Sequence, residues 1–294
     1  MNKNQYLKYL ILSILSIIAV LLFWWTRPSE ASKDEVEDLF LNQDEKGYSF
    51  FVAGHTYGNP ESYQLGLYPD FKRHFGFLNE YPNMKAGFLT GDVVPKPTHE
   101  YWGAALSDLE SLTIETHIAP GNHDKGPVFD SLFPSYYAMG LNQDLFIVLS
   151  ADQWNIEGKQ LDFLRETLDS LDENVNNVFV FCHELIYWTP ENEFSSWEPN
   201  YRPHYPGSTN YWEEVYPLLS SLEQQVYLFS GDVGATTVVS DFEFVRFEGI
   251  YYCASGMGNG VNDNFIIVDV NNKGKAEVHF FNLNAEEPEE VFPD

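Results

Sequence analysis

The chain of 294 residues carries a formal net charge of −28. So acidic a protein would repel a nucleic-acid backbone unless metal ions screened it, so the composition argues against a phosphate polymer as substrate. The two cysteines, Cys182 and Cys253, both lie inside apolar runs, which favours buried thiols over a disulfide framework.

The chain begins with a strongly apolar segment. Between residues 9 and 25 the only polar residues are Ser13 and Ser16, and the run ends in Trp24 and Trp25. Its length approaches the roughly 20 residues of a membrane-spanning helix, and tryptophans are typical of a membrane interface. We therefore expect a membrane anchor at residues 1–25, with a cytoplasmic N-terminus and an extracytoplasmic C-terminal domain. The alternative is a cleaved signal peptide, which would give a secreted protein.

Polar segments flank the part of the chain that is expected to fold. Residues 26–46 are charged and predict a stalk or linker, and residues 285–294 are rich in Glu and Pro and predict a solvated acidic tail. Residues 47–284 are long enough for one α/β domain with a sizeable core.

Strand and helix patterns alternate through the first half of this domain, and the second half is rich in strands. Such alternation predicts βαβ units and a partly parallel sheet. The expected helices are 69–78, 99–109 and 157–171. The expected strands are 48–53, 88–90, 113–118, 145–149, 178–182, 226–229, 244–247, 250–253, 265–270 and 276–281.

Three of the expected strands end in polar residues. They are followed by Gly91-Asp92, by the motif Gly121-Asn122-His123-Asp124, and by His183. Gly, Asn and Asp are common in ordinary turns, so each motif alone is weak. Open α/β sheets bind ligands at the carboxyl ends of their strands, and three such ends in this order favour one shared site.

With these motifs the chain resembles the calcineurin-like metallophosphoesterases. The five motifs of that family are, in order, Asp-x-His, Gly-Asp, Gly-Asn-His-Asp/Glu, a lone His and Gly-His-x-His. The second, third and fourth are intact here, and the resemblance covers roughly residues 47–284. It implies a four-layer α/β/β/α sandwich of two mixed β-sheets flanked by helices.

The first and fifth motifs depart from the family. His55 stands where the family has Asp, and Tyr57 stands where it has His. Imidazole is a common metal ligand, and a phenolate binds ferric iron. In the fifth motif Asp232 replaces the first His, whereas Gly234 replaces the second and offers no side chain.

The resemblance implies the roles of the matching residues. Asp92 would bridge two metal ions, Asn122 and His183 would bind the second ion, and His123 would assist catalysis. Asp124 is expected to orient His123 by accepting its other ring hydrogen, with a simple structural role as the alternative.

The altered motifs change the expected ligand count. The second metal position retains four donors, whereas the first has Asp92, His55 and Tyr57 and has lost one ligand. We therefore expect a single-metal or unequal two-metal site, in which Glu184 or Asp152 are candidate replacements. The donors suit one or two divalent or trivalent ions, Mn, Fe or Zn rather than Ca. The second position's donors are Asp92, Asn122, His183 and Asp232.

The substrate is expected to meet an aromatic, proline-broken segment at residues 185–216. Trp188 could stack on a sugar or base, and Arg202 and His204 could contact phosphate. The alternative is a lid packed by its own aromatic side chains. We expect a small or glycan- or lipid-borne phosphate ester as the partner, and no nucleic acid.

The predicted function is that of a membrane-anchored, metal-dependent phosphoesterase. Metal-activated water would attack the phosphate ester, and His123 would act as general acid. A degenerate family member that binds a phosphorylated ligand or partner without turnover is one alternative. An enzyme that uses the altered site for a different metal-dependent reaction is another.

Overall fold

A computed structural model describes residues 47–61, 64–202, 209–285 and 289–291, all of which belong to the compact unit Lys33–Asp294. The expected anchor at 1–25 and linker at 26–46 lie outside these ranges. Within them, no helix is long and apolar enough to cross a membrane, and the helix α7 (Gly158–Asp169) has 12 residues where a spanning helix needs roughly 20. On this finding the predicted localisation, a single-pass membrane protein, is wrong.

The described residues form two mixed β-sheets of six strands each. The first sheet consists of β1 (Tyr48–Ala53), β2 (Met84–Leu89), β3 (Glu115–Ile118), β10 (Asn264–Val270), β11 (Ala276–Asn282) and β12 (Glu289–Val291). Their order is β12-β11-β10-β1-β2-β3, with β1, β2 and β3 parallel and the other pairs antiparallel. Part of the expected acidic tail thus pairs with the sheet as β12.

The second sheet has the order β4-β5-β6-β7-β9-β8. Here β5, β6, β7 and β9 are parallel, and β4 and β8 are antiparallel edge strands. The strands are β4 (Tyr137–Leu141), β5 (Asp144–Val148), β6 (Asn177–Phe181), β7 (Gln225–Ser230), β8 (Phe242–Phe247) and β9 (Ile250–Ser255). β5 and β6 are buried along their whole length, as expected for apolar strands inside a parallel sheet.

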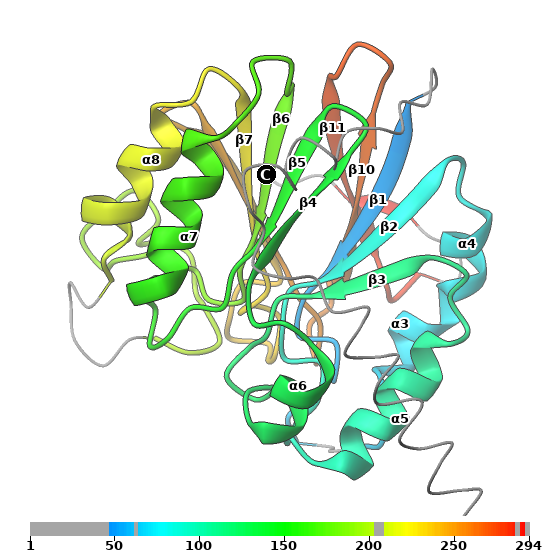
Figure 1. The fold of residues 1–294 in the computed structure, drawn as a ribbon. Helices are drawn as coiled ribbons and strands as arrows, with labels where there is room; N and C mark the ends of the chain where they lie inside the picture. The colour runs from blue at the N-terminus through cyan, green and yellow to red at the C-terminus, as the bar shows by residue number, and fades with distance from the viewer. Residues whose placement is uncertain (1–46, 62–63, 203–208, 286–288, 292–294) are drawn as a thin grey trace, which may run out of the picture. The chain divides into compact units, whose positions relative to one another are not determined.

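Helices cover the outer face of each sheet (Figure 1). The first sheet is covered by α3 (Pro69–Arg73), α4 (Phe75–Glu80), α5 (His99–Leu109) and α6 (Pro127–Leu132). The second is covered by α7, the π-helix η1 (Tyr211–Val215) and α8 (Tyr216–Ser220). The expected α/β/β/α sandwich is confirmed.

Alternation along the central strand β1 explains the layers. Phe50 and Val52 belong to the core between the sheets, whereas Phe51 and Ala53 belong to the core under the helices. Successive side chains of a strand point to opposite faces, so one strand contributes to both cores. Between the sheets the packing is aromatic, with the rings of Phe88 and Phe181 stacked at 4.0 Å.

Several elements differ from the sequence prediction, among them α6, η1, α8 and β12, which were not expected. The expected helix 69–78 is divided at His74, which has non-helical dihedral angles and whose Nε2 lies 3.1 Å from the carbonyl oxygen of Leu283. The edge strand β4 was not expected. Its residues are all half-buried and show no alternation, so only its pairing with β5 defines it.

Candidate metal centre at the strand ends

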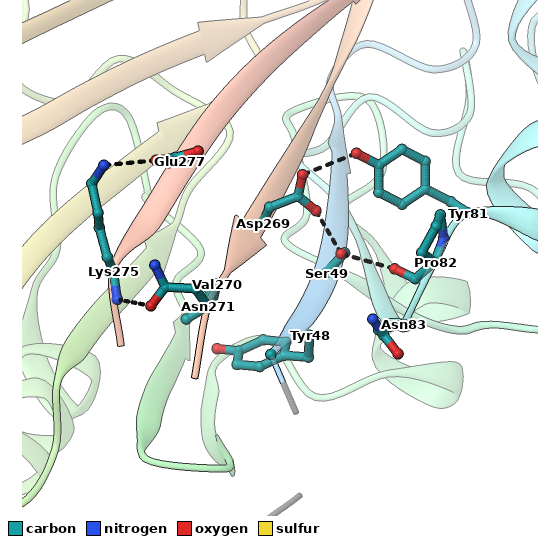
Figure 2. Close-up of a pocket in the computed structure, with 11 residues that line it drawn as sticks. Tyr48, Ser49, Tyr81, Pro82, Asn83, Asp269, Val270, Asn271, Lys275 and Glu277 are labelled. Atoms are coloured by element: carbon teal, nitrogen blue, oxygen red, sulfur yellow. Dashed lines mark hydrogen bonds and ion pairs between the residues drawn. The ribbon is translucent and has the colours of Figure 1, made fainter. Parts of the chain in front are cut away.

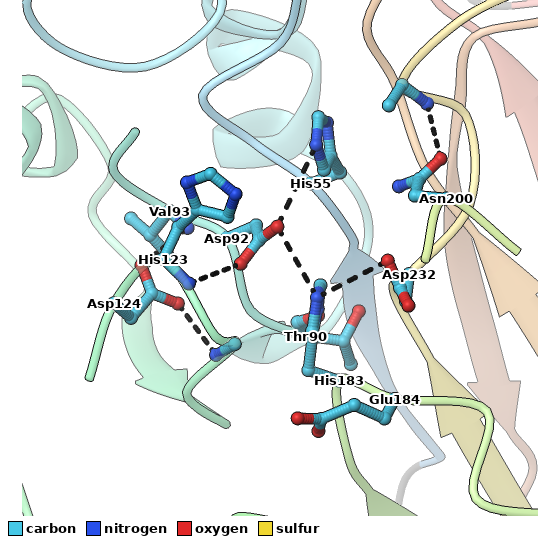
Figure 3. Close-up of polar contacts among 12 residues, drawn as sticks. His55, Thr90, Asp92, Val93, His123, Asp124, His183, Glu184, Asn200 and Asp232 are labelled. Carbon is cyan, nitrogen blue, oxygen red and sulfur yellow. Dashed lines mark hydrogen bonds and ion pairs between the residues drawn. The ribbon is translucent and has the colours of Figure 1, made fainter. Parts of the chain in front are cut away.

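The carboxyl ends of strands from both sheets meet at the side chain of Asp92 (Figure 3). Asp92 follows β2, and its Oδ1 accepts a hydrogen bond from the backbone N–H of His123 at 3.1 Å. Its Oδ2 lies 3.4 Å from Nε2 of His183 and 3.8 Å from Nε2 of His55. Asp92 is 3 % exposed, so these contacts are shielded from water.

His183, at the end of β6, links Asp92 to a second carboxylate. Its Nδ1 donates to the carbonyl oxygen of Thr90 at 2.9 Å, which directs Nε2 towards Asp92 and leaves it 3.6 Å from Oδ1 of Asp232 after β7. The backbone N–H groups of Gly231 and Asp232 donate to the carbonyl oxygen of His183 at 2.9 and 3.0 Å. The ends of β6 and β7 are therefore locked together.

The glycines of the two intact motifs are required by this packing. A Cβ on Gly91, which has φ +80°, would lie 2.6 Å from the ring of His183. A Cβ on Gly121 would lie 2.3 Å from Oδ1 of Asp92. Asp92 itself has φ +52°, a left-handed conformation that costs free energy in a residue other than glycine. Glycine is needed here for close approach to the ligand-bearing side chains.

The acidic side chains of this cluster stabilise a positive charge near them. Burial lowers the pKa of His183, but Asp92 and Asp232 more than offset it and raise that pKa to about 10. Burial raises the pKa of Asp232 well above its ordinary value, and burial also opposes ionisation of Asp92, whose pKa His183 nevertheless holds below the usual range. The ionised Asp92 thus favours a cation beside it, either a proton on His183 or a metal ion, and such a cation in turn favours ionisation of Asp232.

His55 and Tyr57, which replace the ligands of the first motif, both line the cluster. His55 is 2 % exposed, its Nδ1 lies 2.8 Å from the carbonyl oxygen of Met257, and burial lowers its pKa to about 4, so the ring is neutral. The ring of Tyr57 lies 4.3 Å from His55 and 5.4 Å from His123. The proton of the neutral ring is therefore on Nδ1, so the unprotonated Nε2 faces Asp92 and can bind a metal ion.

The carboxylate of Asp124 binds backbone N–H groups. Its fully buried carboxylate accepts from the N–H groups of Val93 at 2.8 Å, Val94 at 3.1 Å and Gly121 at 2.8 Å. The Nδ1 of His123 instead pairs with the carbonyl oxygen of Pro95 at 3.0 Å. Of the two expectations for Asp124, these contacts match the structural one, because it joins the loops after β2 and β3.

Two of the three other expected donors, Asn122 and Asp152, lie apart from the cluster, whereas Glu184 is buried directly after His183 in the chain. Asn122 is exposed, and the contacts of the described residues do not join its amide to Asp92 or His183. Glu184 pairs with Lys125 at 3.3 Å. Asp152 is exposed and belongs to an isolated bridge with Asn155.

Gly234 is also fixed by its surroundings. It has φ +80°, and a Cβ there would lie 2.5 Å from the carbonyl carbon of Gly256 and 2.6 Å from the backbone nitrogen of Met257. The backbone around position 234 therefore leaves no room for the histidine of the family motif. No side chain fits at this position without displacement of the loop after β9.

The aromatic segment mostly forms core. Trp188 is 4 % exposed, donates its indole N–H to the carbonyl oxygen of Trp197 at 3.0 Å, and carries the guanidinium of Arg202 over its ring at 5.4 Å. Arg202 also pairs with Glu198. His204 lies outside the described residues. The ring of Trp188 therefore packs within the protein and is not an open stacking surface.

The buried cluster contains donor atoms that a single cation could share. Nε2 of His183 and Oδ2 of Asp232 are buried and have no hydrogen-bond partner among the described residues. Four ligands about 2.1 Å from a tetrahedral ion are about 3.4 Å apart, close to the separations of 3.4 to 3.8 Å here. Among the described residues, no group of three or more His, Cys, Asp or Glu side chains could hold a metal ion in the positions that they occupy here. The side chains would therefore have to draw closer around an ion.

A pocket of about 450 Å³ lies at the opposite end of β1 (Figure 2). Its polar side chains pair with one another. Ser49 and Tyr81 donate to the carboxylate of Asp269 at 2.6 and 3.0 Å, and Lys275 donates to Glu277 at 2.7 Å. The pocket is therefore separate from the cluster around Asp92.

A solved structure shares this fold. A purple acid phosphatase from yellow lupin seeds superposes with a TM-score of 0.60 at 10 % identity, over 85 % of this chain and 53 % of the lupin protein. This chain thus spans about half the length of that enzyme. A predicted phosphoesterase from Streptococcus pneumoniae TIGR4 has a TM-score of 0.39 at 9 % identity, covering 83 % and 97 % of the two chains. The sulfate thiohydrolase SoxB of Thermus thermophilus has a TM-score of 0.41 at 11 % identity, over 77 % of this chain and 44 % of SoxB.

No family model and no curated protein matches the sequence. The likeness to the lupin phosphatase is therefore one of fold.

Proposed function

Because the chain has the calcineurin-like metallophosphoesterase fold, we propose that it hydrolyses a phosphate ester with the help of one bound metal ion. The observation that carries this proposal is the buried group of His55, Asp92, His183 and Asp232. In it Asp92 lies 3.4 Å from His183 and 3.8 Å from His55, and His183 lies 3.6 Å from Asp232. The net charge of −28 favours a small or glycan- or lipid-borne phosphate ester over a nucleic acid.

Each residue has a distinct task in this proposal. Asp92, His183, Asp232 and the neutral His55 hold the ion, and oxygen and imidazole donors suit Mn, Fe or Zn. A bound ion of this kind lowers the pKa of water and polarises a phosphoryl oxygen.

His123 is the candidate proton donor to the departing oxygen. Its Nδ1 is fixed by the carbonyl oxygen of Pro95, so the ring orientation is set and Nε2 is the nitrogen that remains for the substrate. The ring of Tyr57, 5.4 Å from His123, packs against it and restricts its movement.

Hydrolysis of an aryl phosphate by the full-length chain tests the proposal. We expect turnover that depends on added Mn²⁺ or Zn²⁺ and that falls at least a hundredfold in Asp92→Asn. Asp162→Asn is the matched control. Asp162 lies on the exposed face of α7, and among the described residues its carboxylate pairs with Arg165, one turn farther along the same helix. Equal turnover in Asp92→Asn and Asp162→Asn would rule the site out.

A binding function without turnover is the second candidate. Two observations favour it, the backbone that excludes a side chain at Gly234 and the exposed position of Asn122. In that case the chain would bind Zn²⁺ and a phosphorylated ligand, and Asp92→Asn would abolish binding, while no phosphate would be released.

A further inference from the structure

Asn200 joins two segments that are distant in sequence, the aromatic segment 185–216 and the loop after β7 (Figure 3). Its backbone N–H donates to the carbonyl oxygen of Asp232 at 2.8 Å. Its Nδ2 donates to the carbonyl oxygen of Val233 at 3.0 Å, and its Oδ1 accepts from the N–H of Ala235 at 2.8 Å. Because both ends of the side-chain amide are used, the bonds to Val233 and Ala235 require a side-chain amide at this position.

The loop after β7 needs an anchor at this point. Its first residues, Gly231 and Asp232, are held by the carbonyl oxygen of His183. Farther along, a side chain at position 234 could have tied the loop to the metal, but Gly234 has none and lies against Gly256. Asn200 holds the same stretch of loop from the other side.

The part of the chain that carries Asn200 is itself firmly packed. Trp197 is 5 % exposed and accepts a hydrogen bond from Trp188. Glu198 and Ser240 exchange two hydrogen bonds, from the N–H of Glu198 to Oγ of Ser240 at 3.0 Å and from the N–H of Ser240 to the carbonyl oxygen of Glu198 at 2.9 Å. Asn200 therefore extends from a fixed base.

From these contacts we propose that Asn200 is a positioning residue that keeps the carboxylate of Asp232 within reach of the ion held by Asp92 and His183. This assignment rests on the metal-dependent function proposed above. Asn200 acts through the backbone of residues 232–235, which sets where the side chain of Asp232 begins. Residues that support a metal ligand typically change metal affinity 10- to 100-fold, so loss of the Asn200 side chain should weaken Zn²⁺ binding on the order of tenfold.

Asn192 provides a matched control in the same segment. Its Nδ2 donates to the carbonyl oxygen of Tyr187 at 2.7 Å, and its Oδ1 accepts from Thr189 at 3.3 Å and Phe194 at 3.0 Å. The side chain of Asn192 makes three hydrogen bonds and that of Asn200 makes two, but the bonds of Asn192 stay within the segment. Asn192→Ala should therefore lower stability without a change in metal affinity.

The test is the Zn²⁺ affinity of the full-length chain, measured by competition with a chromophoric chelator. Asn200→Ala should bind about tenfold more weakly than the wild type and Asn192→Ala should bind equally well. Asn200→Asp, which keeps the acceptor for Ala235 but loses the donor to Val233, should fall between them. Without metal, hydrogen exchange of residues 231–236 should be faster in Asn200→Ala than in Asn192→Ala.

The outcomes separate this proposal from the function on which it rests. Wild-type affinity in Asn200→Ala, or equal weakening by Asn192→Ala, would overturn the positioning role alone. A wild type that binds no Zn²⁺, and is indistinguishable from Asp92→Asn, would overturn the proposed function and the positioning role with it.

Discussion

Oδ2 of Asp92 and Nε2 of His183 lie 3.4 Å apart, although the two residues follow strands of different sheets. This contact joins the sheets at their carboxyl ends, where ligands of open α/β sheets bind. Both side chains are almost completely buried, so the negative charge of Asp92 interacts strongly with a proton on His183 or with a bound cation. The predictions below follow from the way that the chain supports this pair.

Restoration of the family's histidine at position 234 should damage the protein. Gly234→His puts a Cβ 2.5 Å from the backbone of Gly256 and forces a side chain into a backbone with φ +80°. We expect a fall in unfolding free energy of several kcal/mol, on the scale of overpacked cores, and no second metal. Thermal melting and metal analysis check both.

Gly103→Ala is the control for Gly234→His. Gly103 lies in α5, and a Cβ there meets nothing within 4 Å. Alanine should stabilise this helix by about 1 kcal/mol. If Gly234→His melts at the wild-type temperature and binds a second ion, the backbone argument at this position is wrong.

Asp124→Asn should lower stability. The carboxylate accepts three backbone hydrogen bonds, and an amide NH₂ in place of one oxygen would face N–H donors. We expect a loss of roughly 2 kcal/mol in unfolding free energy, the scale of a buried unsatisfied donor, measured by urea denaturation. Unchanged stability together with lost turnover would instead support a catalytic role for Asp124.

Asp144 should make stability depend on pH. This buried carboxylate accepts from Tyr48 at 2.6 Å and from the side chain of Asn177 at 2.7 Å, and burial raises its pKa to about 6 from 3.8. The folded state binds this proton more tightly than the unfolded state. The protonated carboxyl group of Asp144 therefore stabilises the folded state in full below about pH 4, and this stabilisation is lost as pH rises through about 6.

Asp144→Asn removes this titration and keeps the shape. Relative to the wild type, the variant should gain unfolding free energy between pH 4 and pH 8, by up to about 3 kcal/mol. Urea denaturation of both proteins at the two pH values measures this gain. A difference that does not change with pH would show that Asp144 has an ordinary pKa.

Much of the fold was predictable because its signals are local. Strand and helix boundaries near Tyr48, Glu157 and Phe265 follow from alternation, turn residues and apolar runs, which the neighbouring sequence sets. β4 was missed because only its partner β5 makes it a strand. The break at His74 was missed because it involves Leu283, far away in sequence.

The site was predictable in part for a related reason. Asp92, His183, His55 and Asp232 carry recognisable chemistry at strand ends, and the structure brings them together. Trp188 was misjudged because aromatic composition does not distinguish a stacking surface from a core. Asn200 carries no sequence signal at all, since its role depends on a loop 32 positions farther along the chain.

Metal stoichiometry of the full-length chain tests the central claim most directly. After dialysis against excess Zn²⁺ or Mn²⁺ and removal of free ions, elemental analysis should give one ion per wild-type chain and none in Asp92→Asn, with Asp162→Asn equal to the wild type. Two ions per chain, or one ion retained in Asp92→Asn, would contradict a single metal site built around the Asp92–His183 pair.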